Sequence, residues 1–307
     1  MSFLVKRPGF YSLLVDEGRY QGLHVGLPGS GPVDYASFLL GNALVGNAAP
    51  EALTALEVRM QGPHLIATAE HEIALLGTGL HLRVQRGEHS FQVAPGHTVH
   101  VTPGDEIFLP VEPEQLGGCA YLCVQGGFRS ADILGSRCAL QPLQGGEDLP
   151  AEPARRRPSR WVILEPWPEA SPTLRLIPGT HLTDELRLLL ERTTFSIRME
   201  SNRMGLRLAS DATWEVHLPE LISAPVVPGT LQLPPGGQPI LLGVEAQTIG
   251  GYPRLGHVIT PDLDQLGHLS PGKTLRFSLI TQEQAEQLNQ SYRNWLKNWQ
   301  NRLLLSQ

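Results

Sequence analysis

Five short segments combine glycine with charged or polar side chains, a composition suited to binding a small polar ligand. Glycine lets the backbone approach a ligand closely, and the neighbouring side chains then fix its orientation. The five segments are Asp16–Arg19, Gly26–Asp34, Gly135–Arg137, Ser201–Gly205 and Gln247–Pro253. Turn chemistry with surface polar residues is the simpler explanation for any one of them. Five in one chain favour a polar cleft.

Motifs of several other chemistries are absent. There is no GxSxG nucleophile elbow and no GxGxxG dinucleotide loop. The eleven histidines show no HExxH spacing, and the nearest approach to a pair is His97 with His100, so no metal site is predicted. The three cysteines form no CxxC pair, and we expect Cys119 and Cys123 to be small core hydrophobes in a reducing compartment.

One nucleotide motif is matched literally, because Gly267–Thr274 reads GHLSPGKT and satisfies GxxxxGK[ST]. A phosphate-binding loop of this kind follows a strand and opens a helix. Here Pro261–Leu266 is predicted to be a short helix that ends at the first glycine of the motif. The residues after Lys273 alternate between apolar and polar, which predicts a strand after a type II turn at Pro271-Gly272. We interpret the match as turn chemistry.

Composition indicates a compact, β-rich protein. Glycine (32) and proline (26) make up about a fifth of the 307 residues, and charged residues are 18%, below the usual share of about 25%. A hydrophobic content of 41% suffices for a core, and a net charge of −6 gives nucleic-acid binding little support. No apolar run reaches the roughly 18 residues of a membrane span, and Met1–Gly9 does not resemble a signal peptide, so we expect a cytoplasmic protein.

Short alternating or apolar runs, separated by glycine and proline, predict many short strands, as in barrels or sandwiches. In the first half these runs are Phe10–Val15, Glu72–Leu76, Leu80–Val84, Thr98–Val101, Ile107–Val111 and Tyr121–Val124. In the second half they are Trp161–Leu164, Leu174–Ile177, Thr194–Met199, Leu231–Leu233, Ile240–Val244 and Leu275–Ile280. The stretch between the halves is rich in glycine, proline and charge, which is typical of a linker; its run Arg155–Arg157 is interpreted as solvated charge.

Three further helices are predicted. Asp34 is expected to cap the first, which runs to Val45, and Thr183 begins the second. Thr281 and Gln284 form a capping box for a C-terminal amphipathic helix. Its apolar stripe is Ala285, Leu288, Tyr292, Trp295, Trp299 and Leu303. The stripe either packs against the protein's own barrel or forms a subunit interface, so a homo-oligomer is left open.

The order and spacing of the polar segments resemble the KipA family, also described as the biotin-dependent carboxyltransferase family or allophanate hydrolase subunit 2. Its bacterial members include the C subunit of the ATP-dependent 5-oxoprolinase. The resemblance extends from about residue 8 to about residue 280, and three of its motifs are specific. These are SNRMGLRL (Ser201–Leu208), VPGTLQLPPGGQPILL (Val227–Leu242) and QTIGGYPRLGHVI (Gln247–Ile259). Less specific matches are Asp16–Arg19, Gly26–Asp34, Asn42–Asn47, Leu56-Glu57, Gly62-Pro63, Tyr121–Phe128 and Ile133–Arg137.

This resemblance implies a mainly β fold with two cyclophilin-like β-barrel domains, few short helices and a cleft between the halves that accepts substrate. With the linker, it gives an N-terminal barrel over 1–145, a linker over 146–160, a second barrel over 161–281 and a C-terminal helix over 282–307. In one branch of the family the corresponding region carboxylates urea from carboxybiotin. In the other, the subunit works with two partner proteins to open a lactam ring at the expense of ATP.

Both reactions act on a small amide, and both need donors that polarise a carbonyl and bind an oxyanion. The resemblance implies catalytic roles for Asp16, Asp34 and Arg203, and an anion-binding role for Arg19 that it shares with Arg203. Asp34 is interpreted equally well as a plain helix cap. The remaining predicted substrate-binding residues are Asn202, Gln247, Thr248, Gly250, Gly251 and Tyr252. Among them Gln247, Gly250 and Gly251 are expected to hold the carbonyl.

The chain departs from the usual family pattern at four places, each near a predicted site. Val15 replaces glutamine, Cys138-Ala139 replaces Ser-Thr, Ala224 replaces glutamate, and Glu245-Ala246 replaces aspartate followed by a basic residue or histidine. Each of these changes is expected to remove a hydrogen-bonding or charged group. They favour a divergent substrate or a regulatory role as alternatives to the usual activity.

Three functions are therefore expected. The first is a component of a 5-oxoprolinase-like amidohydrolase that uses ATP together with two partner proteins, one KipI-like and one lactam-utilisation-like. The second is a biotin-dependent carboxyltransferase acting on urea or another small amide; because no Met-Lys-Met segment is present, a partner would carry the biotin. The third is a non-enzymatic antagonist of a KipI-like kinase inhibitor.

Overall fold

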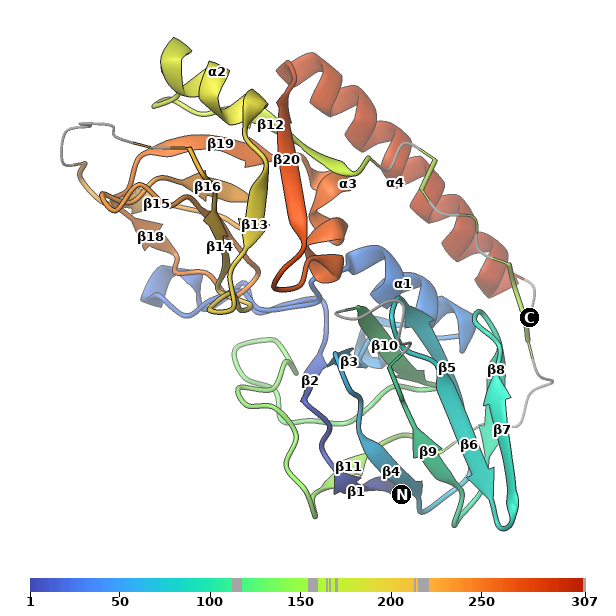
Figure 1. Ribbon diagram of the computed structural model, residues 1–307. Coiled ribbons are helices and arrows are strands. Elements are labelled where there is room, and N and C mark those ends of the chain that lie inside the picture. The colour runs from blue at the N-terminus through green and yellow to red at the C-terminus, as the bar shows by residue number, and fades with distance from the viewer. Residues whose placement is uncertain are drawn as a thin grey trace. The chain divides into compact units, whose positions relative to one another are not determined.

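The computed structural model describes residues 1–111, 118–153, 160–163, 165, 167–168, 171–212, 214 and 221–305 (Figure 1). The described residues form many short strands and four α-helices, which confirms the predicted mainly β fold with few helices and a C-terminal helix. Arg155–Arg157 of the predicted linker lie outside the described residues. None of the helices in the described part has the length and apolar character needed to cross a membrane.

The chain divides into two compact units. The first comprises residues 1–19, 34–165 and 295–307, and the second comprises residues 20–33 and 166–294. These bounds differ from the expected division at 145, 160 and 281. Residues 20–33 leave the N-terminal half to join the second unit, and the C-terminal helix is shared between the two.

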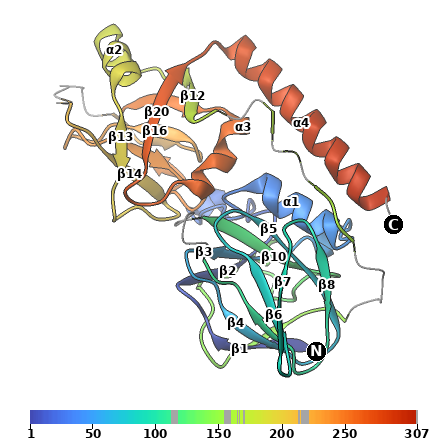
Figure 2. The ribbon, with the colours of Figure 1, turned by 45° about the vertical axis from the view of Figure 1, so that its right-hand side comes forward.

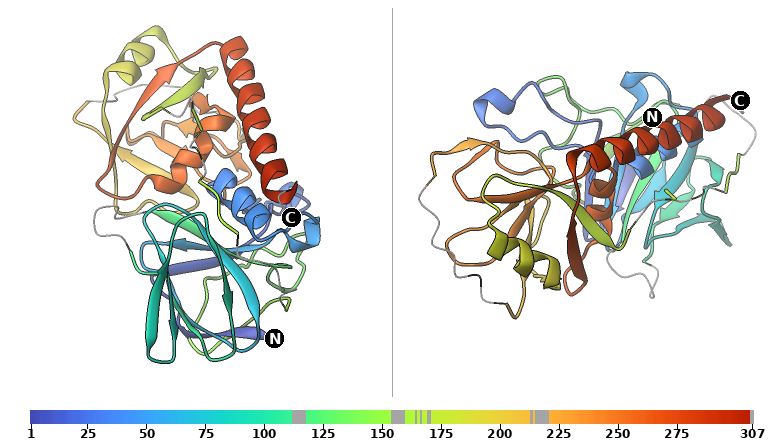
Figure 3. Two further views of the ribbon diagram at one scale, coloured as in Figure 1. Left: turned by 90° about the vertical axis from the view of Figure 1, so that its right-hand side faces the viewer. Right: turned by 90° about the horizontal axis from the view of Figure 1, so that it is seen from above.

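The first unit is built from two antiparallel sheets, whose strands can be followed in Figure 3. One sheet has the order β11 (Asp148–Pro150), β1 (Ser2–Arg7), β4 (His64–Ala67), β9 (Glu106–Phe108), β6 (Leu82–Arg86), β7 (His89–Val93). The other has the order β2 (Tyr11–Val15), β3 (Ala55–Arg59), β10 (Cys119–Val124), β5 (His71–Gly77), β8 (Thr98–Val101). Both sheets contribute to one core, in which Phe3, Leu65, Leu56 and Ile73 are fully buried. Cys119 and Cys123 are fully buried, as predicted.

The second unit contains a closed seven-stranded barrel. Its order is β12 (Thr173–Pro178), β19 (Arg254–Val258), β16 (Thr230–Gln232), β17 (Ile240–Leu242), β14 (Gly205–Ala209), β13 (Phe195–Ile197), β20 (Thr274–Leu279). The parallel pair β12 and β20 closes the barrel, and the other pairs are antiparallel. A separate two-stranded ribbon joins β15 (Ala224–Pro225) to β18 (Ile249–Gly250). Leu231, Leu241 and Phe277 lie in the barrel core.

The predicted helix starts are confirmed. Asp34 caps α1 (Tyr35–Leu44) by accepting from the Ser37 N–H at 2.9 Å, and Thr183 caps α2 (Asp184–Arg192) by accepting from Leu186. Both bonds satisfy N–H groups that have no partner inside their helix. Short 3₁₀ turns cover Leu23–Val25, Pro50–Ala52 and Asp264–His268.

The long helix α4 (Gln282–Leu305) begins at the predicted capping box (Figure 2). Gln284 accepts from the Thr281 N–H at 2.9 Å, and the Thr281 hydroxyl accepts from the Gln284 N–H at 3.2 Å. Its buried residues are Ala285, Tyr292, Leu296 and Leu303, whereas the predicted stripe members Trp295 and Trp299 are only half-buried. This burial favours packing of the stripe within the chain.

The literal nucleotide motif has the predicted order of elements. A helix, α3 (Thr260–Leu263), and a 3₁₀ turn precede it, and β20 follows it. Gly272 has φ = 85°, as the third residue of a type II turn requires, and the Lys273 ammonium donates to the His268 carbonyl at 2.9 Å. The predicted helix over Pro261–Leu266 is instead α3 followed by the 3₁₀ turn Asp264–His268, and the N-cap of α3, Ile259, makes no side-chain cap bond. A strand, and not a helix N-terminus, follows the glycine of the motif, so the segment does not fit a nucleotide.

The predicted strand at Trp161–Leu164 is not formed in its described residues. Trp161 makes a single isolated bridge to His97, and Leu164 lies outside the described residues. The side chains of Trp161 and Ile163 are 67% and 77% exposed. An apolar run with no core surface to cover has nothing to hold it in a sheet.

Candidate functional site

In the first unit, Asp16 directly follows β2 and is buried beside the segment Gly135–Cys138. Its carboxylate accepts from the Arg137 N–H at 2.6 Å, the Ser136 hydroxyl at 2.7 Å and the Gly18 N–H at 2.9 Å. Burial alone would raise the pKa of Asp16, but these bonds and one from the Cys138 thiol outweigh it, so the pKa lies below its ordinary value. Asp16 is therefore an ionised anchor for the segment.

Arg19 also bonds to this part of the chain. Its side chain is 2% exposed and donates to the carbonyls of Ile133 at 3.0 Å and Cys138 at 2.6 Å. We call Asp16, Arg19 and Ile133–Cys138 the anchored loop. Asp16 accepts hydrogen bonds from N–H and O–H groups of the loop, and Arg19 donates to two of its carbonyls. Both predicted site residues therefore stabilise the backbone of the loop. Their roles toward a substrate stay predictions.

The anchored loop also explains one family departure. Cys138 stands where serine is usual, and its buried thiol donates to the Asp16 carboxylate at 3.0 Å. Burial raises the pKa of this thiol, so it remains a neutral donor in place of the hydroxyl. The expectation that this position has lost a hydrogen-bonding group is therefore wrong, since the Cys138 thiol supplies one.

Asp34 lies elsewhere in the first unit. Its carboxylate accepts from the Ser37 N–H and, at 2.6 Å, from the Ser37 hydroxyl, and its own N–H donates to the Tyr121 hydroxyl at 2.9 Å. Tyr121 in turn donates to the fully buried Glu57 at 2.8 Å. This chain of bonds joins α1 to β10 and β3, so the helix-cap interpretation of Asp34 is confirmed. A catalytic role for it stays a prediction.

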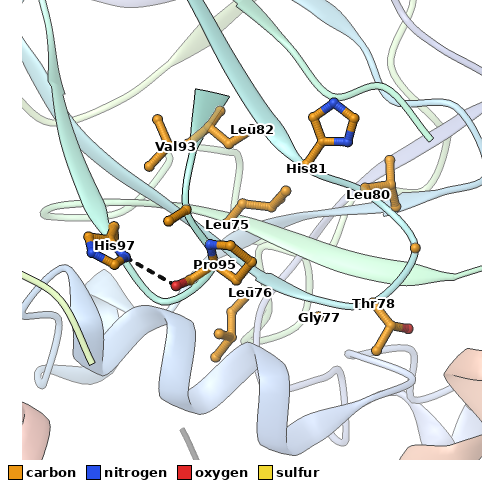
Figure 4. A pocket seen from close by; sticks show the side chains of 12 residues that line it. Leu75, Leu76, Gly77, Thr78, Leu80, His81, Leu82, Val93, Pro95 and His97 are labelled. Atoms are coloured by element: carbon orange, nitrogen blue, oxygen red, sulfur yellow. Dashed lines mark hydrogen bonds between the residues drawn. The ribbon is translucent and has the colours of Figure 1, made fainter. Parts of the chain in front are cut away.

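A small hollow of about 150 Å³ lies in the first unit, between the turn after β5 and the segment before β8 (Figure 4). Most of its wall is leucine, valine and glycine, with Thr78, His81 and His97 as polar members. His97 bonds to the Pro95 carbonyl at 3.1 Å, as Figure 4 shows. None of the predicted site residues lines this hollow.

In the second unit, the structure brings two of the five polar segments together with Glu245, which lies two residues before a third. Arg203 is 5% exposed, its Nε lies 2.9 Å from the Glu245 carboxylate, and its Nη2 donates to the Gly31 carbonyl at 2.7 Å. Ser30, which has φ = 55°, donates to the same carboxylate at 3.0 Å. The Gly26–Asp34 segment thus meets the Ser201–Gly205 turn and the residues preceding Gln247.

Asn202 has a local role in that turn. Its side chain accepts from the Met204 N–H at 2.9 Å, and its backbone pairs with Gly205. The side chain is exposed, and the turn places Arg203 against Glu245. Sequence reasoning named Arg203 but missed its partner Glu245, which it noted only as a family departure.

The loop Gln247–Tyr252 carries the remaining predicted residues and contains β18. The Thr248 carbonyl accepts from the Val226 N–H at 3.0 Å, which attaches the loop to the ribbon strand β15. Gly250 lies against two glutamine side chains: a Cβ atom there would be 2.8 Å from Nε2 of Gln232 and 3.6 Å from Nε2 of Gln247. Tyr252 is 43% exposed at the end of the loop.

Gln232 was not among the predicted residues, although it lies inside a recognised motif. It is 1% exposed, and its Nε2 has no hydrogen-bond partner among the described residues. The signal that could have found it is a polar residue between Leu231 and Leu233 in a short strand. We call Arg203, Glu245, Gln247, Gly250 and Gln232 the second-unit site.

A family model described as "Carboxyltransferase domain, subdomain A and B" matches residues 25–279. The chain belongs to this family. The matched range covers the whole second-unit site as well as Asp34 of the first unit, whereas Asp16 and Arg19 precede it.

Curated relatives of this carboxyltransferase-domain chain are named as enzymes or as enzyme subunits. The chain is 28% identical to the C subunit of 5-oxoprolinase of Escherichia coli strain K12 over 95% of both chains. It is 28% identical to the protein of the same name in Haemophilus influenzae over 89% of both. It is also 26% identical to a urea amidolyase of Lachancea kluyveri, where the match covers 94% of this chain but 17% of the relative.

Solved structures agree with the fold. The crystal structure of a protein designated TTHA0988 superposes with a TM-score of 0.79 at 33% identity, covering 90% of this chain and 55% of that one. The chain therefore spans about half of that protein. The urea amidolyase of Kluyveromyces lactis superposes with a TM-score of 0.82 at 24% identity, covering 97% of this chain and 20% of that one.

Proposed function

We propose that this chain is one component of a 5-oxoprolinase-like amidohydrolase complex, which cleaves 5-oxoproline to glutamate in a reaction driven by ATP hydrolysis. The observation that carries the proposal is the match to the C subunit of 5-oxoprolinase of Escherichia coli, which covers 95% of both chains. Opening the lactam consumes one water, and hydrolysis of ATP to ADP and phosphate consumes a second. The substrate is a small cyclic amide that also carries a carboxylate.

The second-unit site supports this proposal, because it offers donors without a strongly nucleophilic side chain. Gln247 and the Gly250–Gly251 backbone hold the lactam carbonyl, whose oxygen gains negative charge as the ring opens. Arg203 forms an ion pair with Glu245 and donates to the Gly31 carbonyl, so we assign it to positioning the Gly29–Gly31 turn beside the loop. The nucleophile and the phosphate chemistry then fall to the partner proteins.

The same proposal includes two partner proteins, one KipI-like and one lactam-utilisation-like. ATP is assigned to the complex rather than to this chain, because the GxxxxGK[ST] segment does not fit a phosphate. There the Lys273 ammonium is bound to the His268 carbonyl, and a strand follows the turn. Lys273→Ala is accordingly expected to leave the ATP dependence of the complex unchanged.

The test is to purify the chain with the two partner proteins and to measure glutamate released from 5-oxoproline, with and without ATP. We expect release only with ATP and with all three proteins present. Gln247→Ala is expected to reduce turnover at least about tenfold, since a donor to a developing oxyanion contributes on the order of 3 kcal/mol. The matched control is Gln287→Ala, an exposed glutamine of α4. An intact complex that releases no glutamate contradicts the proposal.

A second candidate is carboxyl transfer from a biotin carrier to urea or another small amide. The observation that favours it is the family description together with 26% identity to a urea amidolyase over 94% of this chain. Incubating the chain with carboxylated biotin and urea distinguishes the two candidates. Urea-dependent loss of the carboxyl group supports carboxyl transfer, and its absence alongside ATP-dependent glutamate release supports the lactam reaction.

A further inference from the structure

Two neighbouring residues of the second-unit barrel have buried donor groups for which the described residues provide no acceptor. Gln232 on β16 and Arg254 on β19 are directly paired across the two antiparallel strands. Neither Nε2 of Gln232 nor Nε of Arg254 has a hydrogen-bond partner among the described residues. A buried donor without an acceptor costs about 1–3 kcal/mol, so two adjacent ones indicate a ligand that supplies the acceptors.

Both side chains point to the same place outside the barrel. Leu231 is fully buried in the barrel core, so Gln232, the next residue, faces away from that core. Gln232 reaches Gly250 of β18, and Arg254 donates through Nη1 to the Pro225 carbonyl of β15 at 3.5 Å. Because β15 and β18 are paired strands of one ribbon, the two donors end at adjacent positions beneath it.

The free edge of Arg254 suits a carboxylate. A guanidinium presents Nε and Nη2 on one edge, which matches the two oxygens of a carboxylate. Arg175 uses this edge in the same unit, donating to Asp262 from Nε at 3.0 Å and from Nη2 at 2.5 Å. Arg254 donates to the Pro225 carbonyl through Nη1, which does not belong to this edge. The Nε edge has no carboxylate from the described residues.

Gly250 allows the Gln232 amide to approach the ribbon backbone closely. A Cβ atom at this position would lie 2.8 Å from Nε2 of Gln232, closer than a Cβ atom normally approaches. The φ of Gly250 does not lie in the left-handed region, so the backbone does not require glycine. The reason for a glycine here is therefore that a side chain would displace the Gln232 amide from its present position.

We propose that Gln232 and Arg254 bind the carboxylate of a small amide substrate beneath the β15–β18 ribbon. The identity of that substrate as a lactam rests on the proposed function, whereas the carboxylate site rests on the contacts described above. With the carboxylate held there, Gln247, whose Nε2 is near the same glycine, is placed to reach the amide carbonyl of the same molecule.

The test compares binding of 5-oxoproline with that of 2-pyrrolidinone, the same ring without the carboxylate, by calorimetry on the full chain and on its complex with the partner proteins. We expect 5-oxoproline to bind at least about tenfold more tightly, the change that about 1.4 kcal/mol corresponds to. Arg254→Gln and Gln232→Leu are expected to weaken binding of 5-oxoproline by about the same factor, and to leave binding of 2-pyrrolidinone unchanged. Arg276→Gln, an exposed arginine of β20, is the control.

A glycine pair gives a second, steric test that spares the charged groups. Gly250→Ala is expected to reduce the preference for 5-oxoproline, because its Cβ atom would displace the Gln232 amide. Gly236→Ala should preserve the preference, because a Cβ atom there meets nothing within 4 Å. Thermal unfolding of each variant checks that the fold is retained. Arg254 is partly exposed, so we expect Arg254→Gln to fold. This variant therefore tests the site even if Gln232→Leu does not fold.

The outcomes separate this inference from the proposed function. Equal binding of the two ligands, or unchanged binding of 5-oxoproline by Arg254→Gln, overturns the carboxylate site even if the complex releases glutamate. Selective binding of 5-oxoproline that depends on Arg254 supports the site even if the complex releases none. Failure of both ligands to bind, alone and in the complex, also counts against the site.

Discussion

The two units use the same kinds of residue in opposite ways. In the anchored loop of the first unit, the Asp16 carboxylate and the Arg19 guanidinium bond to donors and acceptors of the protein's own backbone. In the second unit, the paired residues Gln232 and Arg254 keep buried donors for which the described residues supply no acceptor. A polar, glycine-rich segment thus has a structural role where its buried groups are all hydrogen-bonded within the protein. It is a candidate binding site where some of those groups have no partner.

The largest expected effect is the loss of the anchored loop. Asp16→Ala removes the acceptor of Arg137, Ser136 and Gly18, and it leaves buried donors unpaired. We expect the free energy of unfolding to fall by about 2–4 kcal/mol, as measured by urea denaturation. Asp148→Ala, at an exposed position of β11, should change it by less than about 0.5 kcal/mol. Similar effects of the two substitutions would mean that the carboxylate is not an anchor.

Substitution of Arg203 tests whether this residue of the second-unit site has a structural role. Arg203→Ala removes the donor to the Gly31 carbonyl and leaves the Glu245 carboxylate with the Ser30 hydroxyl but without its ion-pair partner. We expect a loss of about 2 kcal/mol, again by urea denaturation, and a smaller loss for the double variant Arg203→Ala/Glu245→Ala. Arg207→Ala, an exposed arginine of β14, is the matched control. A stable Arg203→Ala variant that has lost activity would instead support the predicted catalytic role.

Substitution of Gln232 should not lower the stability of the ligand-free protein, in contrast to substitution of Asp16. Gln232→Leu keeps the approximate volume of the side chain and removes a buried donor that has no described acceptor. We expect the ligand-free protein to be unchanged or more stable by up to about 1 kcal/mol, with the melting temperature as the measurement. A clear loss of stability would show that Gln232 is satisfied in the folded protein and would break the comparison.

The smallest expected effect is on the titration of His257, whose ring nitrogen lies 3.1 Å from the Thr230 hydroxyl. Burial and, to a lesser degree, Arg254 lower its pKa in the folded protein. The unfolded chain therefore binds the proton more readily, and the stability that depends on neutral His257 is present above pH 6.5, the ordinary value, and is lost as the pH falls below it. Arg254→Gln should raise this pKa in NMR titrations, whereas Arg276→Gln should leave it unchanged.

Local features of the structure were predictable from the sequence, because each depends on residues close in the chain. The cap at Asp34, the capping box at Thr281 and the turn at Gly272 all follow from side chains within a few positions. The prediction of a strand at Trp161–Leu164 was wrong, because an apolar run forms a strand only where a core surface covers it, and Trp161 and Ile163 are exposed.

The candidate site could be predicted only in part, since its contacts join distant parts of the chain. Arg203 meets Gly31 across 172 positions, and Arg19 meets Cys138 across 119. Sequence patterns predicted that these arginines belong to a site. They do not indicate whether each guanidinium donates to a backbone carbonyl or to a ligand. Gln232 escaped notice because an unpaired donor is a property of the folded surroundings and not of a motif.

The sharing of α4 has a consequence for the order in which the molecule is completed. Residues 282–294 belong to the second unit and residues 295–305 to the first, where Arg160 donates to the Leu303 carbonyl at 3.3 Å. During synthesis the ribosome therefore makes the whole second unit before it makes the last segment of the first. The first unit is therefore completed after the second, and a nascent chain paused after residue 294 should display a first unit that still lacks part of its surface.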